Sequence, residues 1–379
     1  MIITGLWLQN FRSIDDHHWN FDSGLNLFVA PNGSGKSNLI EAVRLLSTGR
    51  SWRTNQTKEL IHWGEELARL KAQVLKQPVD EDTSFDDEAS SAISTNKENE
   101  QNQKNGLDRG EVVELEQTLT VGEVAGRRAA GRLYKLNGVG KRRADVIGEL
   151  ATVVFTPEDM LVFQIGPAAR RELLNNLLIQ TDREYDRHLR QYEQVLRRRN
   201  KLIQQLKEGG VTRYDFFYWD QQLIDSGQYL QQARQQFLTW LEKQTGISED
   251  YRIIYDNSEI SEARLRRYAN QEVRAGHTLV GPHKDDWQIL VKRSDQWRDI
   301  GVYGSRGEQR LSLLWFKLKE ADYLFNRHQD KPVLLLDDVF SELDDQNCQL
   351  LLDHADDRQM IITTVPGQEV LPEFAKSLF

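Results

Sequence analysis

One stretch near the start of the chain restricts the possible folds more than any other. Residues 30–37 (APNGSGKS) lie between a short apolar segment, residues 25–29 (LNLFV), and residues 38–47, where apolar side chains recur with helical spacing. A strand, a glycine-rich loop and a helix in this order form a cradle for phosphate, because loop amides and the helix dipole face the same point. A glycine-rich turn without a ligand is the alternative interpretation.

Each position of this loop has an expected role in binding a nucleotide. The backbone amides of residues 33–35 are expected to surround the phosphates, since glycine tolerates the positive φ values required. Lys36 is expected to reach the β- and γ-phosphates, and Ser37 to bind Mg²⁺. The motif normally begins with glycine, and Ala30 stands there instead. Its β-carbon is predicted to crowd the loop and to weaken nucleotide binding.

A second motif lies near the other end of the sequence. Residues 333–336 (VLLL) form an apolar run that ends in Asp337 and Asp338. This is the pattern of a buried strand that presents carboxylates at its end, a Walker B motif. Asp337 is expected to hold Mg²⁺, and Asp338 to act as a general base or to position the attacking water.

Two further motifs accompany the Walker B strand. Residues 305–309 (SRGEQ) precede a long amphipathic helical pattern, and serine and glycine at a helix N-terminus form an anion site. The same residues fit an ordinary helix cap, but their position ahead of Walker B favours the signature motif of ABC-type ATPases. Residues 341–344 (SELD) match a D-loop. The strand expected at residues 360–364 ends in Thr364, where ATPases of this type often carry a histidine.

The spacing of the motifs predicts the architecture. The phosphate loop ends at residue 37 and the signature begins at residue 305, an interval too long for a compact transporter cassette. The sequence therefore predicts an α/β fold with a split ATPase head, in which mixed sheets surround the phosphate loop. The expected domains are residues 1–170 and 276–379, which form the head, and residues 171–275, a short inserted helical-hairpin arm.

The helical arm is predicted from apolar spacing. Leu189, Tyr192, Leu196 and Ile203 follow a seven-residue rhythm, which Arg199 interrupts at one position. The pair Gly209-Gly210 ends this helix. A second helical stretch at residues 215–243 is expected to pack against the first as an antiparallel hairpin.

The composition narrows the class of protein and its surroundings. The chain has a net charge of −9 and a single cysteine, Cys348, which excludes an internal disulfide framework. Its first residues resemble a strand rather than a secretion signal, and no apolar run is long enough to span a bilayer, so a cytoplasmic protein is expected. Residues 80–107 are almost entirely polar and rich in Asp and Glu, and we interpret them as a flexible acidic insertion.

Basic residues outside that insertion are candidates for contacting DNA. Residues 48–53 (TGRSWR) combine arginine with tryptophan, which suits contacts to phosphates and bases, although a solvated loop is an equal alternative. Residues 127–143 hold a second basic group around a hairpin turn expected at Asn137-Gly138; a solvated charged hairpin is again the alternative. The candidates are Arg50, Arg53, Lys58, Arg127, Arg128, Arg132, Lys141, Arg142 and Arg143.

A polar turn in the second half of the chain allows two interpretations. Residues 281–286 (GPHKDD) place His283 close to two aspartates, which raises the possibility of a metal site. The spacing is not specific for a metal, and a Gly-Pro turn explains the polar residues, so a turn is the favoured interpretation.

Taken together, the motifs resemble those of the RecF family, bacterial recombination ATPases related to SMC-type heads. The resemblance spans nearly the whole chain apart from residues 80–107. Its most specific motifs are residues 281–286 and 336–344. The motifs that carry it are residues 8–12 (LQNFR), 32–37 (NGSGKS), 48–51 (TGRS), 155–159 (FTPED), 305–307 (SRG), 281–286 (GPHKDD) and 336–344 (LDDVFSELD).

The resemblance implies a split ABC/SMC-type head that uses ATP and Mg²⁺. Two heads are expected to enclose two ATP molecules and to close on double-stranded DNA near single-strand gaps, with RecR and RecO directing RecA loading. Slow, DNA-stimulated hydrolysis is expected to reopen the homodimer; a nucleotide-binding scaffold without useful turnover is the alternative. Lys36, Asp337 and Asp338 are the expected catalytic residues. The expected nucleotide-binding residues are Ala30, Asn32, Gly33, Ser34, Gly35, Lys36, Ser37, Ser305, Gly307, Gln309, Asp344 and Thr364.

Overall fold

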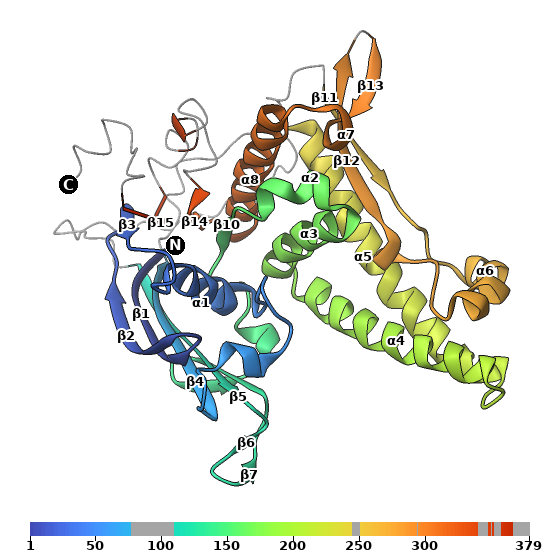
Figure 1. Cartoon of the computed structure of the whole chain (residues 1–379), viewed down its shortest axis with the longest axis horizontal. Coiled ribbons are helices and arrows are strands. Elements are labelled where there is room, and N and C mark those ends of the chain that lie inside the picture. The colour runs from blue at the N-terminus through green and yellow to red at the C-terminus, as the bar shows by residue number, and fades with distance from the viewer. Residues whose placement is uncertain are drawn as a thin grey trace, which may run out of the picture.

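Two sheets with a helix between them form one end of the molecule, and a group of long helices forms the other (Figure 1). The computed structural model describes residues 1–76, 110–244, 251–293, 295–339, 348–349, 351 and 358–366. The acidic stretch expected at residues 80–107 and the D-loop expected at residues 341–344 lie outside these ranges. Within them, no helix is long and apolar enough to cross a membrane.

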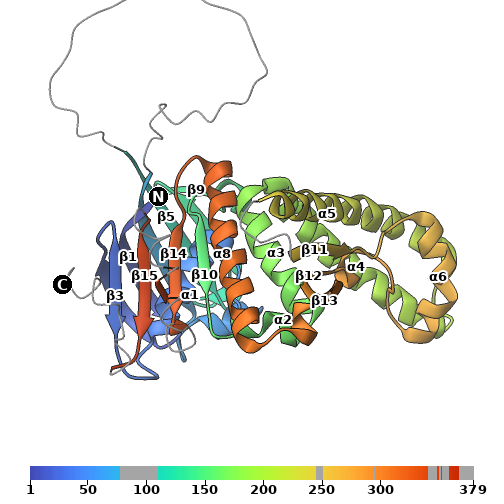
Figure 2. The same cartoon turned by 90° about the horizontal axis from the view of Figure 1, so that it is seen from above.

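The first sheet is parallel and joins strands from both ends of the sequence. Its order is β10-β14-β15-β3, with β3 (Leu25–Val29), β10 (Thr152–Phe155), β14 (Val333–Asp337) and β15 (Met360–Thr364). A parallel sheet is covered on both faces, which explains why β14 and β15 are buried along their whole length. Figure 2 shows the four strands side by side, with helix α8 (Arg306–His328) next to β10.

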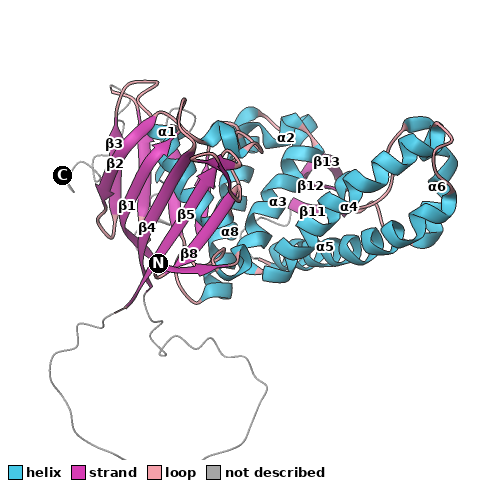
Figure 3. Cartoon of the chain, turned by 90° about the horizontal axis from the view of Figure 1, so that it is seen from below, coloured by secondary structure: helices cyan, strands magenta, loops and turns pink. Residues whose placement is uncertain are grey.

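The second sheet is antiparallel and forms the outer layer of the head (Figure 3). Its strand order is β2-β1-β4-β5-β8-β9. Asn137 and Gly138 connect β8 to β9 with φ angles of 50° and 76°, so the predicted hairpin turn is confirmed. The strands are β1 (Ile2–Phe11), β2 (Ile14–Asn20), β4 (Leu67–Lys76), β5 (Glu111–Thr120), β8 (Arg132–Leu136) and β9 (Val139–Lys141), and a separate ribbon is formed by β6 (Glu123–Val124) and β7 (Arg127–Arg128).

Helix α1 (Lys36–Thr48) contacts strands of both sheets and is buried on nearly all sides. The sequence predicted a helix with one apolar face, and this expectation was incomplete. Polar residues on the other side of the helix are buried with partners: Glu41 accepts hydrogen bonds from Arg12 and from the Ser51 hydroxyl. Ser47 donates to Gln180 at 2.8 Å. A helix held by two layers positions its N-terminus rigidly.

Helices dominate the middle of the chain. They are α2 (Val162–Ile165), α3 (Pro167–Thr181), α4 (Arg183–Lys207), α5 (Phe217–Lys243), α6 (Glu262–Ala275), α7 (Ile300–Tyr303) and α8 (Arg306–His328). The predicted hairpin of α4 and α5 is confirmed: Gln191 bonds Gln222 near the turn, whereas Tyr185 bonds Arg234 farther from it, so the two helices run antiparallel. In Figure 1, α6 lies at the far end of this arm.

A small sheet connects this helical region to the second half of the chain. It has the order β11-β12-β13, with β11 (Tyr251–Asp256), β12 (Asp286–Arg293) and β13 (Gln296–Asp299). The expected domain boundary after residue 275 therefore falls between two strands of one sheet. The division into three domains stays a prediction.

Buried ion pairs hold the arm together where the sequence pattern was irregular. Arg199, which interrupts the heptad rhythm, is buried and pairs with Asp220 at 2.6 Å and with Glu272 of α6 at 2.8 Å. Asp285 of the GPHKDD segment pairs with Arg234 at 2.9 Å. Its other oxygen accepts a hydrogen bond from Gln231, so α5 is tied firmly to this segment.

His283 of the same segment is also occupied by protein groups. Its Nδ1 accepts a hydrogen bond from Tyr192, and its Nε2 donates to the Thr278 carbonyl at 3.1 Å. Burial lowers the pKa of His283 to about 4, although the bond to Thr278 opposes this shift. These contacts agree with the turn interpretation; the part of the chain that the structure describes holds no group of three metal-ligating side chains.

Replacing Arg234 by methionine is expected to destabilise the chain by about 3–5 kcal/mol, because it leaves Asp285 as an uncompensated buried charge. The midpoint of urea unfolding, followed by circular dichroism, measures the effect. Arg266→Met, which breaks an exposed pair with Glu262, is the control and should cost less than about 1 kcal/mol. Adding Asp285→Asn to Arg234→Met should recover part of the loss. Equal effects of the two single substitutions would contradict the prediction.

Candidate nucleotide site and basic groove

The phosphate loop leads from the end of β3 into α1 as the sequence predicted. Gly33 and Gly35 have φ angles of 83° and 94°, values that favour glycine, and Gly35 caps the helix. Residues 31–34 are exposed, and the Ser34 amide donates to the Pro31 carbonyl at 3.3 Å within the loop. Ala30 has an ordinary negative φ and donates its amide to the Thr364 carbonyl at 3.1 Å. An alanine at this position therefore causes no backbone strain.

Lys36 lies beneath the loop and points toward the Walker B strand. Its side chain is almost fully buried, its Nζ donates to the Ala30 carbonyl, and the same nitrogen lies 3.8 Å from Asp338 Oδ1. A buried ammonium group that contacts the loop and lies near Asp338 is well placed to bind a phosphate oxygen, because such charge-assisted hydrogen bonds are strong.

The two Walker motifs meet directly. Ser37 Oγ donates to Asp337 Oδ1 at 2.9 Å, although the two residues are 300 positions apart in the sequence. Asp337 also accepts a hydrogen bond from Thr363 Oγ1 at 2.7 Å, which fixes the carboxylate. Hydroxyl and carboxylate oxygens are the ligands that Mg²⁺ prefers, and here two of them are close enough to contact one ion. These residues fit a magnesium ion.

Asp338 adopts a strained backbone at the end of β14. Its φ angle is 51°, which is unusual for a residue other than glycine, and its amide donates to the Thr363 carbonyl at 3.1 Å. Burial raises the pKa of Asp338, with Asp337 adding to the shift and Lys36 opposing it. Strain of this kind is retained where the surroundings fix it, and functional sites are such places.

The signature segment forms the N-terminus of α8. Ser305 caps the helix by accepting a hydrogen bond from the Glu308 amide, and Glu308 accepts one from the Ser305 amide at 2.8 Å. Because α8 ends at His328 shortly before β14 begins, the helix runs antiparallel to β14. The N-terminus of α8 therefore lies toward the carboxyl ends of the parallel strands, where the Walker B carboxylates lie.

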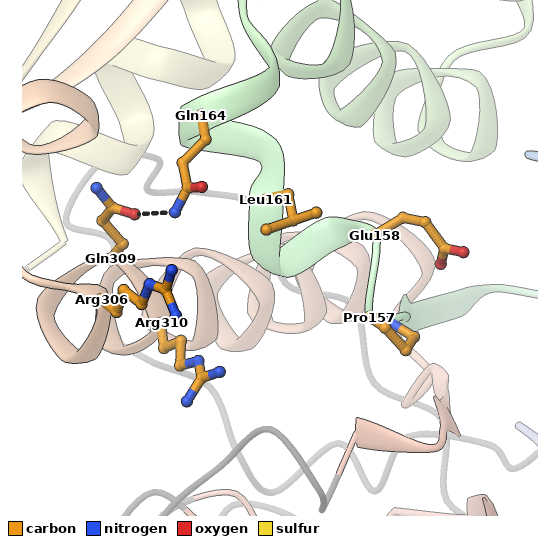
Figure 4. Close-up of a pocket in the computed structure, with 7 residues that line it drawn as sticks. All are labelled: Pro157, Glu158, Leu161, Gln164, Arg306, Gln309 and Arg310. Carbon is orange, nitrogen blue, oxygen red and sulfur yellow. Dashed lines mark hydrogen bonds between the residues drawn. The ribbon is translucent and has the colours of Figure 1, made fainter.

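A cavity of about 400 Å³ lies beside the start of α8 (Figure 4). Arg306 and Arg310 line one side, and Pro157 and Glu158 line the other. Gln309 was expected to contact nucleotide, but its side chain is buried: it accepts a hydrogen bond from Gln164 and donates to the carbonyls of residues 300, 301 and 304. In this structure Gln309 therefore holds the signature loop in place.

Exposed side chains surround the signature. Ser305 and Gly307 are both exposed, and a β-carbon added at Gly307 would meet no atom within 4 Å. Val302, Tyr303 and Leu311 are large apolar side chains that are exposed nearby. An apolar surface of this kind next to polar residues is typical of a protein interface.

A basic groove lies between the head and the arm. It has a volume of about 680 Å³ and is lined by Trp52 and Tyr134, by arginines from the head and by residues of α4. Trp52 lies between two guanidinium groups, with Arg44 at 5.2 Å and Arg53 at 5.5 Å from its ring centre. The head contributes Arg50, Arg53, Arg132 and Arg143, and α4 contributes Arg190 and Arg197 together with Glu193.

The chain is similar to known proteins along nearly its whole length. The sequence matches the family model RecF/RecN/SMC N terminal domain over residues 2–374. DNA replication and repair protein RecF from Thermoanaerobacter sp. is 31% identical, and the alignment covers 96% of this chain and 94% of the relative. The RecF protein of Herpetosiphon aurantiacus is 30% identical over 100% of this chain and 97% of its own length. The chain belongs to the RecF family.

Solved RecF structures share the fold. A structure of the recombination mediator protein RecF-ATP in the RecFOR pathway superimposes with a TM-score of 0.77 at 29% identity, covering 98% of this chain and 93% of that chain. The RecF-ATPrS structure of the same pathway gives a TM-score of 0.78 at 29% identity, covering 97% and 93%. These matches confirm the predicted RecF-type head with mixed sheets.

Other predicted nucleotide residues of this RecF chain lie close to the phosphate loop. Asn32 and Ser34 are exposed in the loop, and Thr364 is buried at the end of β15, beside Ala30. Asp344 lies outside the described residues. The roles of all these residues stay predictions.

The predicted DNA-binding residues fall into two groups. Arg132 and Arg143 reach into the groove but are tied to backbone carbonyls of residues 49 and 48, and Arg143 also pairs with Asp186. Arg132 and Arg143 therefore help to hold the loop at residues 48–53. The sequence did not predict this role, because their partners are distant in the chain. Arg50 and Arg53 also line the groove, and Arg50 pairs with Glu193 at 3.0 Å. The other five candidates are exposed outside the groove: Lys58, Arg127, Arg128, Lys141 and Arg142.

Two arginines of α4 also line the groove. They are Arg190, which pairs with Asp186 and was not a candidate, and Arg197. Arg197 begins a run of three arginines at residues 197–199, for which contact with DNA and a solvated face are both open interpretations, the solvated face being the default. The run divides in the fold: Arg197 and Arg198 are exposed, whereas Arg199 is buried.

Proposed function

We propose that this chain is an ATP-driven DNA clamp of recombinational repair. Two heads bind two ATP molecules between them and close on double-stranded DNA near a single-strand gap. RecR and RecO then direct RecA loading at the gap, and slow hydrolysis of ATP reopens the dimer. The RecF relatives, described as DNA replication and repair proteins and solved with ATP within the RecFOR pathway, support this assignment.

One observation supports the proposal: the residues predicted to bind nucleotide fall into two groups on different elements of the chain. Lys36, Ser37 and the two Walker B aspartates gather at one place, whereas Ser305 and Gly307 are exposed on a separate helix end beside bare apolar side chains. A second copy that presents its signature to this phosphate loop completes the site and covers the apolar surface. ATP is then part of the interface and controls its formation.

In the proposed hydrolysis of ATP, a few residues have separate roles. Lys36 binds the terminal phosphates, Ser37 and Asp337 hold Mg²⁺, and Asp338 orients the attacking water and accepts its proton. The metal ion supplies positive charge to the phosphate oxygens. Asp338 is one methylene shorter than the glutamate that is common at this position, which agrees with slow turnover. Ser305 and Gly307 of the second copy donate to the γ-phosphate from the helix N-terminus.

A scaffold that binds nucleotide without turnover is the second candidate. Thr364 stands where a switch histidine is common, and its buried hydroxyl is no base. Ala30 has no backbone strain, but whether its β-carbon weakens nucleotide binding stays a prediction. Turnover measured with and without duplex DNA separates the two functions, because a scaffold shows no stimulation by DNA.

The proposed clamp predicts that ATP shifts the chain from monomer to dimer, and that gapped DNA strengthens the shift. Sedimentation velocity at several protein concentrations, with and without ATP, Mg²⁺ and gapped duplex, measures the two populations. Omission of Mg²⁺ is the control and should leave the chain monomeric. Equal monomer fractions in all conditions would rule out the mechanism.

The basic groove predicts a salt-dependent affinity for duplex DNA. Each phosphate neutralised contributes about −0.9 to the slope of log affinity against log salt. The double substitution Arg53→Gln and Arg197→Gln is expected to make that slope about two units shallower and to weaken binding equally on all sequences. Fluorescence anisotropy over a salt series is the measurement. Arg187→Gln, on α4 outside the groove, is the control; an unchanged slope in the double variant excludes the groove.

A further inference from the structure

The tip of the arm exposes three aromatic side chains. Tyr214, Phe217 and Tyr218 are 92%, 76% and 62% exposed at the turn between α4 and α5. Phe216 beside them is buried under Arg199, whose guanidinium carbon lies 5.6 Å from its ring centre. Phe216 anchors the turn, so the backbone that carries the three exposed rings is held in place. Neither the nucleotide site nor the basic groove uses them.

A cavity of about 330 Å³ opens beside these rings, between the tip and α6. Tyr214 and Phe217 form part of its wall, and Leu265 forms part of its floor. Arg213 lies at its edge and donates to the Ala269 carbonyl at 3.1 Å and to the Asn270 side chain at 3.4 Å. Both partners are neutral. Asp220 also lines the cavity; burial raises the pKa of this carboxyl, whereas Arg199 and Arg213 act against that shift, so Arg213 lies near one negative charge.

Positive charge continues along α6. Arg266 and Arg267 are exposed, and Arg266 forms an exposed pair with Glu262, which a phosphate would have to replace. Arg264 and Arg267 lie 5.9 Å and 6.0 Å from the ring centre of Tyr268. Arginines alternate with aromatic rings on this surface. Guanidinium groups in such positions neutralise phosphates, and the rings offer flat faces to bases.

We propose that the arm tip is a binding platform for single-stranded DNA, in which Tyr214 and Phe217 stack on unpaired bases. Arg213 and Arg266 contact the adjoining phosphates. The proposal rests on the proposed function, because it assigns the single-stranded side of a gap to the arm while the groove binds the duplex side. It is a second DNA surface on the same chain.

The type of side chain that is exposed at the arm tip indicates which ligand binds there. Aliphatic residues at the tip, Ile224 and Leu265, are buried, and the large apolar side chains left exposed there are aromatic. Protein interfaces also favour tyrosine and arginine, so the test below separates the two ligands, whereas base stacking requires rings. Duplex DNA keeps its bases stacked inside, so exposed rings on a surface have no base face to meet. A single strand offers both bases and phosphates.

Binding of a fluorescein-labelled deoxythymidine 20-mer and of a 20-base-pair duplex to the full chain tests the platform by anisotropy. Tyr214→Ala with Phe217→Ala is expected to weaken single-strand binding at least tenfold, since each lost stacking contact costs fivefold or more. Duplex binding and the melting temperature should change little, because both side chains are exposed. Trp63→Ala, at a 96% exposed ring on the head, is the control. Tyr214→Trp with Phe217→Trp should retain single-strand binding.

Crosslinking locates the contact directly. Irradiation of a single strand containing 5-iododeoxyuridine should attach it to Tyr214, Phe217 or Tyr218, as mapped by mass spectrometry. Unchanged single-strand affinity in the alanine variant overturns the platform, and so does an equal loss on duplex. Retained single-strand binding with lost binding of purified RecR assigns the tip to a protein partner instead and also overturns it. ATP-dependent dimerisation of the unaltered chain, measured in parallel, tests the proposed clamp separately.

Discussion

A chain carrying Lys36→Met is expected to stay monomeric in ATP, and so is a chain carrying Gly307→Val, but an equimolar mixture of the two should dimerise. The first substitution removes the ammonium group that lies between the phosphate loop and Asp338. The second places a branched side chain where the signature must approach a nucleotide. In a mixed dimer, the valine variant supplies ATP and its own Lys36, and the methionine variant supplies an intact signature.

The mixture therefore contains one complete composite site for each pair of chains. Sedimentation velocity in ATP and Mg²⁺ should show a dimer in the mixture and monomers in the separate samples. Gly307→Val is tolerated by the monomer, because a β-carbon there meets no atom within 4 Å, so its melting temperature should change little. Lys201→Met, at an exposed lysine of α4, is the control and should dimerise alone. A monomeric mixture would show that the signature does not act in trans.

Asp338→Asn is expected to slow ATP turnover by about 10² to 10⁴-fold and to prolong the closed dimer. Asparagine has the shape of aspartate and tolerates the positive φ of 51° at this position, so the substitution removes the base with little change of structure. Lys36 loses one opposing charge, while Asp337 and Ser37 keep their bond. Phosphate release and the dimer lifetime after dilution are the two measurements.

Asp337→Asn provides the contrast for this experiment. It weakens the contact of Ser37 and Thr363 with a carboxylate and removes a predicted metal ligand, so ATP-dependent dimerisation itself should be lost. If Asp338→Asn hydrolyses ATP at the normal rate, Asp338 is not the base. If it fails to dimerise, its role lies in binding rather than in hydrolysis.

Local patterns allowed much of this fold to be predicted. The strand, glycine loop and helix at residues 25–47 and the apolar strand before Asp337 have strong local preferences, and the structure contains both. The arm hairpin followed from a heptad rhythm and a Gly-Gly stop. The pairing of Ser37 with Asp337 followed from known chemistry rather than from local sequence, because a nucleotide site needs both groups.

Long-range partners explain what the sequence did not predict. Arg199 interrupts an apolar rhythm, yet it is buried, because Asp220 and Glu272 compensate its charge. Gln309 lies within a signature motif, yet it faces inward, where carbonyls of the preceding turn accept its amide. Arg132 was predicted from the sequence to contact DNA, and in the structure it donates a hydrogen bond to the Gly49 carbonyl, 83 residues away. No local pattern identifies such partners.

The position of β3 at the edge of the parallel sheet has a consequence for synthesis on the ribosome. Its neighbour is β15, and Asn26 of β3 bonds the Met360 carbonyl, 334 residues later. At about 5–20 residues per second, translation leaves the strand before the phosphate loop without its sheet neighbour for roughly 15–70 s. The parallel sheet therefore stays incomplete until β15 has left the exit tunnel, and the strand that leads into the phosphate loop gains its neighbour only then.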